Sequence, residues 1–275
     1  IVISHGAQSG LMYELLTSFV KNKPRHLMFD VGGLNGARIN KFETPLIRFA
    51  LRKSPAIIVH SSRQLELYEK HYPNLVEKST FLPFGADFEY FDEGLEINIK
   101  KQIVSFGFAK RDYGTLCEAF CKVGNPDYEL HIIGDRSLSE RYAQNSKIVF
   151  HGKMPISDLM NFIKESAMVA IPLPEFLYSY GQMSFLQSMA LRKAMIVTET
   201  TSSRDYICNV PGVKTVKPED VDDMCIALSE MMQKDKGELL YDGLMNAEYV
   251  RNDFNEKLMS ERVYKFITKV FPELR

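Results

Sequence analysis

Short apolar runs alternate with longer stretches of helical period along most of the chain. The candidate strands are Ile1–Ser4, His26–Val31, Ala56–His60, Ser79–Pro83, Ile103–Gly107, Glu129–Gly134, Ile148–Phe150, Met168–Pro172, Ala194–Thr198 and Val213–Val216. Short strands separated by helical segments are typical of a parallel sheet that is covered by helices. The pattern therefore predicts an α/β fold.

A polar, charge-rich interval from Asp92 to Lys101 interrupts this alternation, shortly after the turn at Pro83–Gly85. Such an interval is typical of a domain boundary, which we place between residues 97 and 98. Beyond Lys217 the spacing predicts helices over Asp220–Gln233 and Asn255–Val270. We expect the last helix to pack across a surface, with the N-terminal domain as its candidate partner. Because the chain opens on Ile1 within a predicted strand, we also expect the N-terminal domain to be incomplete.

Charge and composition narrow the classes of function. The chain has 34 basic and 35 acidic residues and a formal net charge of -1, so nucleic acid is not an expected partner. It contains neither a long apolar run nor the pattern of a signal peptide, which predicts a cytoplasmic protein. The four scattered cysteines indicate reduced thiols, not a disulfide scaffold.

The segment from Val169 to Tyr206 carries the clearest candidate chemistry. It is predicted to run from a strand through a loop into a helix that begins at Gln182, directly after Gly181. The backbone N–H groups of Gln182 and Met183 would lie at the positive end of that helix, a position that suits a diphosphate. A plain strand-helix-strand crossover, in which the glycine only shapes the turn, is an equally good interpretation of this segment alone.

Four motifs in order resemble glycosyltransferase family 4, the group 1 glycosyltransferases. They are FLPFGADFEYF at Phe81–Phe91, IVSFGFAKRDYGTLCEAF at Ile103–Phe120, ELHIIGD at Glu129–Asp135 with IVFHGKM at Ile148–Met154, and the helix Leu186–Ala190 that follows Gly181. Each motif is weak, but their order and spacing make the resemblance specific, and it covers nearly the whole chain.

This resemblance implies a GT-B fold of two Rossmann-like domains. Residues 1–97 would be the second half of the acceptor-side domain plus the interdomain linker, and residues 98–275 would be the nucleotide-sugar-binding domain. The implied reaction is hexosyl transfer from a nucleoside-diphosphate sugar to an acceptor hydroxyl with retention of configuration, in glycan or cell-surface polysaccharide synthesis. The implied acceptor is a glycan or a lipid-linked sugar. No cofactor or metal is expected, and the turn from Phe150 to Met154 would bind the nucleobase.

The sequence departs from the family where two glutamates usually frame the donor loop. Alignment on Met189 and Ala190 puts Ser179 at the position that contacts the sugar and Gln187 at the position that contacts the ribose. Gln187 can still donate to and accept from a hydroxyl group, whereas Ser179 supplies no carboxylate. Glu175, in the same loop, is a candidate replacement, although an exposed loop carboxylate is an equally good interpretation.

A diphosphate leaving group also needs cations to stabilise its developing charge. At the two positions where the family usually carries Arg and Lys, this chain has Phe108 and Tyr113. Lys110 and Arg111 lie between them. We expect Arg111 to be the main phosphate ligand, because a guanidinium can bind two phosphate oxygens, with Lys110 second. The alternative is a solvated pair of cations.

In the N-terminal part, two predicted strands end in glycine-rich loops, which in doubly wound folds line the crevice at the strand ends. His5 ends the first and Asp30 the second, where the family carries a histidine near the transferred sugar. Asp30 is therefore a candidate catalytic residue, with a loop-bracing role as the alternative, and His5 is favoured as a bracing residue. Gly32, Gly33 and Gly36 do not have the spacing of a dinucleotide fingerprint.

A candidate membrane contact lies near the end of a predicted helix. Arg48, Arg52 and Lys53 accompany the apolar residues Leu46 and Phe49 there. A basic amphipathic helix could hold the enzyme peripherally on the cytoplasmic face of a membrane, near a lipid-linked acceptor. Cations near a helix C-terminus are also favourable without a membrane, and that simpler interpretation is preferred at this stage.

The sequence thus predicts a retaining glycosyltransferase. The alternative is a protein of the same fold that binds a nucleotide sugar without catalysis, which the loss of both glutamates motivates. A weaker third hypothesis is an enzyme that modifies a nucleotide sugar, such as an epimerase.

Overall fold

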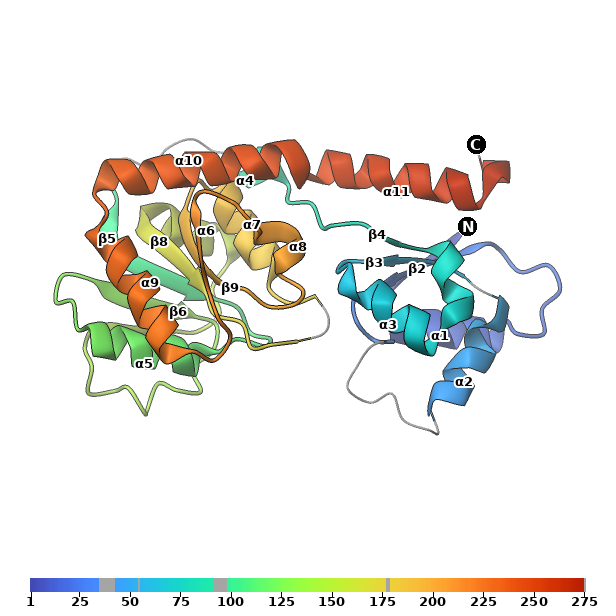
Figure 1. Ribbon diagram of the computed structural model, residues 1–275, viewed down its shortest axis with the longest axis horizontal. Helices are drawn as coiled ribbons and strands as arrows, with labels where there is room; N and C mark the ends of the chain where they lie inside the picture. The colour runs from blue at the N-terminus through green and yellow to red at the C-terminus, as the bar shows by residue number, and fades with distance from the viewer. Residues whose placement is uncertain (35–42, 54, 92–97, 177–178, 275) are drawn as a thin grey trace. The chain divides into compact units, whose positions relative to one another are not determined.

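The computed structural model describes residues 1–275 except 35–42, 54, 92–97, 177–178 and 275 (Figure 1). The chain forms two compact units. Unit 1 consists of residues 1–84, 176–179 and 257–275, and unit 2 consists of residues 85–175 and 180–256. Each unit has one parallel sheet with helices, which confirms the predicted α/β class. The division falls after Phe84, whereas the predicted boundary at residue 97 lies outside the described residues and stays a prediction.

The sheet of unit 1 has the order β1-β2-β3-β4, with strands Val2–His5, His26–Asp30, Ala56–Val59 and Ser79–Phe81. The helices between them are α1 (Ala7–Leu16), α2 (Glu43–Ala50) and α3 (Arg63–His71), with short 3-10 turns at Leu51–Lys53 and Pro73–Lys78. One face of the sheet buries Met28, Ile57 and Val59 against Tyr68 and Leu75.

The last helix, α11 (Glu256–Val270), covers the other face of the same sheet. Its residues Val263, Phe266 and Ile267 pack against a cluster that contains Leu27 and Ile58. The short turn Pro272–Leu274 follows it, and Arg25 near the start of β2 donates to Glu273 there at 2.6 Å. Helix α11 therefore belongs to the same unit as the N-terminal sheet.

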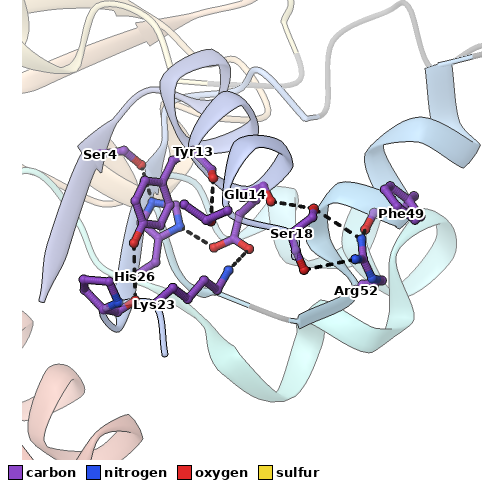
Figure 2. Close-up of polar contacts among 10 residues, drawn as sticks. Ser4, Tyr13, Glu14, Ser18, Lys23, His26, Phe49 and Arg52 are labelled. Carbon is purple, nitrogen blue, oxygen red and sulfur yellow. Dashed lines mark hydrogen bonds and ion pairs between the residues drawn. The ribbon is translucent and has the colours of Figure 1, made fainter. Parts of the chain in front are cut away.

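A buried polar network fastens the end of α1 to the beginning of β2 (Figure 2). His26 bonds through Nε2 to Ser4 Oγ at 2.8 Å and through Nδ1 to Glu14 Oε1 at 2.7 Å, and Lys23 pairs with the other Glu14 oxygen. The Glu14 side chain is 1% exposed. Burial alone would raise the pKa of this carboxyl, but the bonds from His26 and Lys23 outweigh it and hold the pKa below its usual value.

The sheet of unit 2 has the order β10-β9-β8-β5-β6-β7, all parallel. The strands are Lys100–Phe106 (β5), Glu129–Ile133 (β6), Ile148–His151 (β7), Ser166–Ile171 (β8), Ala194–Thr198 (β9) and Val213–Val216 (β10). All the predicted strands of both units form. The largest displacement is at β5, which begins at Lys100 where the sequence predicted Ile103.

Helices cover both faces of this sheet. On one face α5 (Tyr113–Val123) and α9 (Val221–Gln233) bury Leu116, Phe120 and Leu228. The others are α4 (Phe88–Phe91), α6 (Ile156–Glu165), α7 (Gln182–Ala190), α8 (Arg204–Ile207) and α10 (Lys236–Asp253). Asn246 of α10 donates to the carbonyls of Lys193 and Gly212, at 2.8 and 2.9 Å.

The sequence analysis did not resolve α10 as a separate helix. Its apolar residues are spread around the helix, with Tyr241 and Leu244 exposed, so no clear stripe marks it. One local signal was present. Asp235 caps the helix by accepting from Glu238 N at 2.9 Å, and Glu238 accepts from Asp235 N at 2.8 Å, which together form a capping box.

Candidate functional site

The order of strands in unit 2 reverses between β5 and β8, which are paired neighbours. From β5 the chain proceeds outward to β6 and β7, and it then returns to β8 before continuing to β9 and β10. In doubly wound sheets, ligands bind outside the carboxyl ends of the strands at such a reversal. Two loops meet this condition: the loop from Gly107 to Asp112 after β5, and the loop after β8 that leads into α7.

Helix α7 begins at Gln182 as predicted, with Gly181 as its N-cap. Gly181 has a φ of 85°, and a Cβ there would lie 2.7 Å from the Leu173 side chain, so this position requires glycine. No side chain caps the helix. The N–H groups of its first turn therefore remain available to an anion beside the positive end of the helix dipole.

Arg111 connects the two loops. Its Nη2 donates to Ser184 Oγ in the first turn of α7 at 2.8 Å, while Nε donates to Phe106 O at 3.1 Å and Nη1 to Ala109 O at 2.8 Å. Burial lowers the pKa of the guanidinium, and no carboxylate among the described residues pairs with it. A half-buried cation without an anionic partner makes this position a candidate binding site for an anion.

The conformation of the Arg111 side chain depends on Gly107. This glycine has a φ of 129°, and a Cβ on it would lie 2.6 Å from Arg111 Nη2. Any other residue would displace the guanidinium. Tyr113, at the family's lysine position, is buried and donates through its hydroxyl to Gly107 O at 2.8 Å, so here a neutral side chain braces the same loop. Lys110 is exposed on this loop, with a φ of 54°.

Two buried polar groups in the donor-loop region have no hydrogen-bond partner among the described residues. They are Nε2 of Gln182, a residue 2% exposed at the start of α7, and Oγ of Ser179, a residue 5% exposed. Buried polar atoms in native proteins almost always have partners, so such groups call for water or a ligand. The Gln182 amide is thus a candidate donor to a bound anion.

Glu175, the candidate replacement for the carboxylate that Ser179 lacks, accepts hydrogen bonds from another residue of unit 2. Glu175 is exposed and accepts from the backbone N–H of Thr201 at 3.0 and 3.3 Å. Gln187 lies half-buried in the second turn of α7, and Met183 in its first turn is 37% exposed. Gln187 and Met183 thus share the helix that carries the anion site.

The predicted base-binding turn follows β7. Phe150 lies within the strand, and its partly buried side chain packs against the core of unit 2. Met154 is half-buried at the end of the loop. Both side chains are thus partly accessible, and that of Phe150 also contributes to the core.

Next to this turn, His131 and His151 form a pair joined by a bond of 2.9 Å between Nδ1 and Nε2. Burial lowers the pKa of both rings, and for His131 the neighbouring His151 lowers it further. The sequence analysis did not single out either histidine.

In unit 1, Asp30 ends β2 and is fully buried. One of its oxygens accepts from the backbone N–H groups of Gly32 and Gly33 at 2.9 and 2.7 Å, and the other accepts from the Tyr68 hydroxyl at 2.6 Å. Burial raises the pKa of this carboxyl although these bonds oppose it. The geometry favours the loop-bracing alternative for Asp30, because both oxygens are already engaged. Gly36 lies outside the described residues.

Four rings stack in sequence at the carboxyl ends of the strands of unit 1. The centroids of His5 and Phe29 are 6.2 Å apart, those of Phe29 and His60 5.8 Å, and those of His60 and Phe84 3.6 Å. Burial lowers the pKa of His60 to about 4, so its ring is neutral at physiological pH. His5 is exposed at the end of this stack.

Solved structures share the fold of this chain over almost its whole length. The Anabaena protein Alr3699/HepE, solved in complex with UDP, is 9% identical with a TM-score of 0.80, over 97% of this chain and 78% of that one. A glycosyltransferase from Rickettsia africae is 17% identical with a TM-score of 0.79, over 98% and 77%. Sucrose-phosphate synthase from Thermosynechococcus elongatus is 15% identical with a TM-score of 0.77, over 98% and 73%. The predicted GT-B fold with two Rossmann-like domains is confirmed.

Residues 100–234 match the family model described as glycosyl transferases group 1. That stretch contains Arg111, Gly181 and the start of α7, so the candidate anion site lies within the part of the chain that matches this family model. The recognition made from the sequence motifs, and the enzyme class that it implied, are confirmed. The comparison with curated proteins finds no match.

Proposed function

We propose that this protein transfers a hexosyl group from a nucleoside-diphosphate sugar to an acceptor hydroxyl, with retention of configuration at the anomeric carbon. The observation that carries the proposal is the Arg111 guanidinium, which is half-buried without a carboxylate partner among the described residues and bonded to the first turn of α7. Two cationic features, a guanidinium and a helix N-terminus, converge there on one position. The structurally similar protein Alr3699/HepE is solved with UDP and with UDP-glucose, and UDP-glucose is a donor of the proposed class.

In this proposal the donor diphosphate lies against the start of α7. The backbone of Gly181, Gln182 and Met183 and the side chain of Arg111 stabilise the charge that develops on the leaving phosphate, and Lys110 adds a second cation from the exposed loop. Because these groups supply the positive charge, the proposal requires neither a metal nor a cofactor.

The remaining donor contacts are proposed for neutral groups. Gln187 bonds to the ribose hydroxyls, and the loop that contains Glu175 and Ser179 meets the sugar. The turn from Phe150 to Met154 receives the nucleobase. Asp30 acts by shaping the loop after β2 through Gly32 and Gly33, so it is a positioning residue on the acceptor side.

The test is product analysis. Incubation with UDP-glucose, GDP-mannose and ADP-glucose and a panel of glycan and lipid-linked acceptors is expected to release nucleoside diphosphate and to form an α-linked product from an α-linked donor, as read by NMR. A β-linked product would exclude retention. An altered nucleotide sugar without acceptor would instead favour an epimerase.

Binding without turnover is the second candidate, and the uncharged residues Ser179 and Gln187 favour it. Calorimetry separates it from the first. Nucleotide-sugar binding combined with no product across the acceptor panel would establish a binding protein, in which the same anion site serves recognition only.

We further propose that unit 1 attaches peripherally to an anionic membrane, on its cytoplasmic face, during the synthesis of a glycan or polysaccharide. Large apolar side chains are exposed at the end of α1 and on α2, namely Leu16 (76%), Phe19 (85%), Leu46 (56%) and Phe49 (46%). The guanidinium carbon of Arg52 lies 3.9 Å from the ring centroid of Phe49 (Figure 2). It also lies 5.8 Å from the ring centroid of Phe19, so Arg52 connects the two segments. None of the described helices has the length and hydropathy to cross a membrane.

The charged residues near these apolar side chains indicate the kind of partner surface that they would bind. The exposed cations Lys21, Arg48, Arg52 and Lys53 lie close to them in the sequence, whereas Glu14, the acidic residue of α1, is buried. Exposed apolar side chains among cations match the interface of a bilayer that contains anionic lipids.

The membrane proposal predicts sedimentation with vesicles of phosphatidylglycerol and phosphatidylcholine, weakened by salt and absent with phosphatidylcholine alone. Phe19→Ser combined with Phe49→Ser is expected to reduce the bound fraction at least several-fold, because two aromatic side chains that would insert into the bilayer are lost. Ile226→Ser, which changes an apolar residue 55% exposed on α9 in unit 2, is the matched control. Equal binding by the double variant would contradict the proposed surface, and concentration-dependent self-association without vesicles would assign it to a second copy.

A further inference from the structure

Phe108 is an exposed aromatic residue beside the anion site. It directly follows Gly107 at the end of β5, and its side chain is 58% exposed. In the pattern that this chain resembles, an arginine occupies this position. Here the cationic role next to the helix start is held by Arg111 instead, so Phe108 is left with a different function.

Two neighbours hold the ring in place. Gly134 follows β6, and a Cβ on it would lie 2.9 Å from the ring carbons of Phe108, so the absence of a side chain there lets the ring lie against the backbone. Lys153, in the loop after β7, places its ammonium 4.9 Å from the ring centroid, within the range of a cation–π contact. The ring is therefore held by residues of two other loops while more than half of its residue surface stays accessible to a ligand.

The contacts of the Phe108 ring place it along the carboxyl ends of neighbouring strands. The anion site lies where β8 and β5 adjoin, Phe108 reaches over the end of β6, and Lys153 follows β7. Because neighbouring strands are roughly 4.8 Å apart, β5 and β7 are separated by about 10 Å. A nucleoside joined to its phosphates spans a similar length, so a diphosphate bound at α7 brings its base toward the ring.

We propose that the ring of Phe108 is the platform on which the nucleobase of the donor stacks. This inference rests on the proposed function, because it assumes a nucleoside diphosphate at the α7 site. Every nucleobase has a π-face, so stacking contributes affinity with little discrimination between bases. The choice of base is then left to the edge contacts made by the turn after β7. Phe108 is thus a positioning residue for the donor.

The test is calorimetric titration of the full chain with UDP, GDP and ADP, and with inorganic pyrophosphate. Phe108→Ala is expected to weaken the nucleoside diphosphate that binds most tightly by roughly 5- to 150-fold, the range for loss of one stacked base. Pyrophosphate, which has no base, should bind as before. Phe108→Tyr retains a ring and should restore most of the affinity, whereas Phe108→Leu retains bulk alone and should not.

Ile226→Ala on α9 is the matched control, since it removes an apolar side chain of similar exposure. If Phe108→Ala binds UDP, GDP and ADP as tightly as the parent chain, the stacking role is excluded while the proposed function stands. If Phe108→Ala weakens pyrophosphate equally, the residue shapes the anion site and the inference is also overturned. If the parent chain binds none of these ligands, the proposed function fails, and this inference fails with it.

Discussion

Replacing Arg111 with alanine is expected to lower kcat/KM for sugar transfer by about 100- to 1,000-fold, the usual cost of removing one fixed charge donor from a transition state. The guanidinium is half-buried, lacks a carboxylate partner among the described residues, and is bonded to Ser184 of α7. Its interaction with the leaving phosphate strengthens as negative charge develops. The loss should therefore appear mainly in kcat, with a smaller change in the Kd of the nucleoside diphosphate.

Two variants make this prediction specific. Arg111→Lys keeps the charge but cannot bond Phe106, Ala109 and Ser184 together, so an intermediate loss is expected. Lys110→Ala removes an exposed cation from the same loop and should cost less than tenfold. A thermal melt by circular dichroism checks that the loop change leaves unit 2 folded. Full activity of Arg111→Ala would remove this residue from the mechanism.

The second large effect concerns stability. Glu14→Ala is expected to lower the free energy of unfolding of unit 1 by about 3–5 kcal/mol, the typical cost of leaving a buried charge without its partner. Glu14 is 1% exposed and bonds both His26 and Lys23, which would remain in place in the variant (Figure 2). Urea unfolding followed by circular dichroism measures the loss, since the chain has no tryptophan.

The exposed pair Arg63–Glu66 in the same unit provides the control. Both side chains are more than half exposed, so Glu66→Ala should change stability by less than about 1 kcal/mol. Similar losses for Glu14→Ala and Glu66→Ala would show that the buried network contributes no more than a surface pair.

The sequence was sufficient to predict the strands and the start of α7. Apolar runs such as Ile148–Phe150 and Ala194–Thr198 depend on local composition and burial, which a single sequence displays. The glycine before Gln182 marked the helix start for the same local reason. Helix α10 was harder, since its burial is decided by contacts such as that of Asn246 with Gly212, which are distant in sequence.

The sequence indicated which segments of the chain form the candidate site, but not which hydrogen bonds their residues make. The sequence indicated Arg111 as a cation in a loop. Its partner Ser184 is 73 residues away in the chain, and the two meet because β5 and β8 are neighbours in the sheet. The bond between Asp30 and Tyr68 is likewise long-range. That bond favours a bracing over a reactive carboxylate, and the sequence alone left both interpretations open.

The position of α11 in unit 1 has a consequence for the order in which the protein folds during synthesis. Unit 2 is finished before the ribosome reaches Lys257, and its two ends are joined by hydrogen bonds of 2.7 Å from Ala86 N to Phe254 O and 3.0 Å from Glu256 N to Ala86 O. The strands of unit 1 precede unit 2 in the chain, yet one face of their sheet, with Leu27 and Ile58, lacks the cover of α11 until that helix emerges. Of the two units, the one whose synthesis begins first is therefore completed second, and the nascent chain carries an uncovered apolar sheet face while unit 2 is being made.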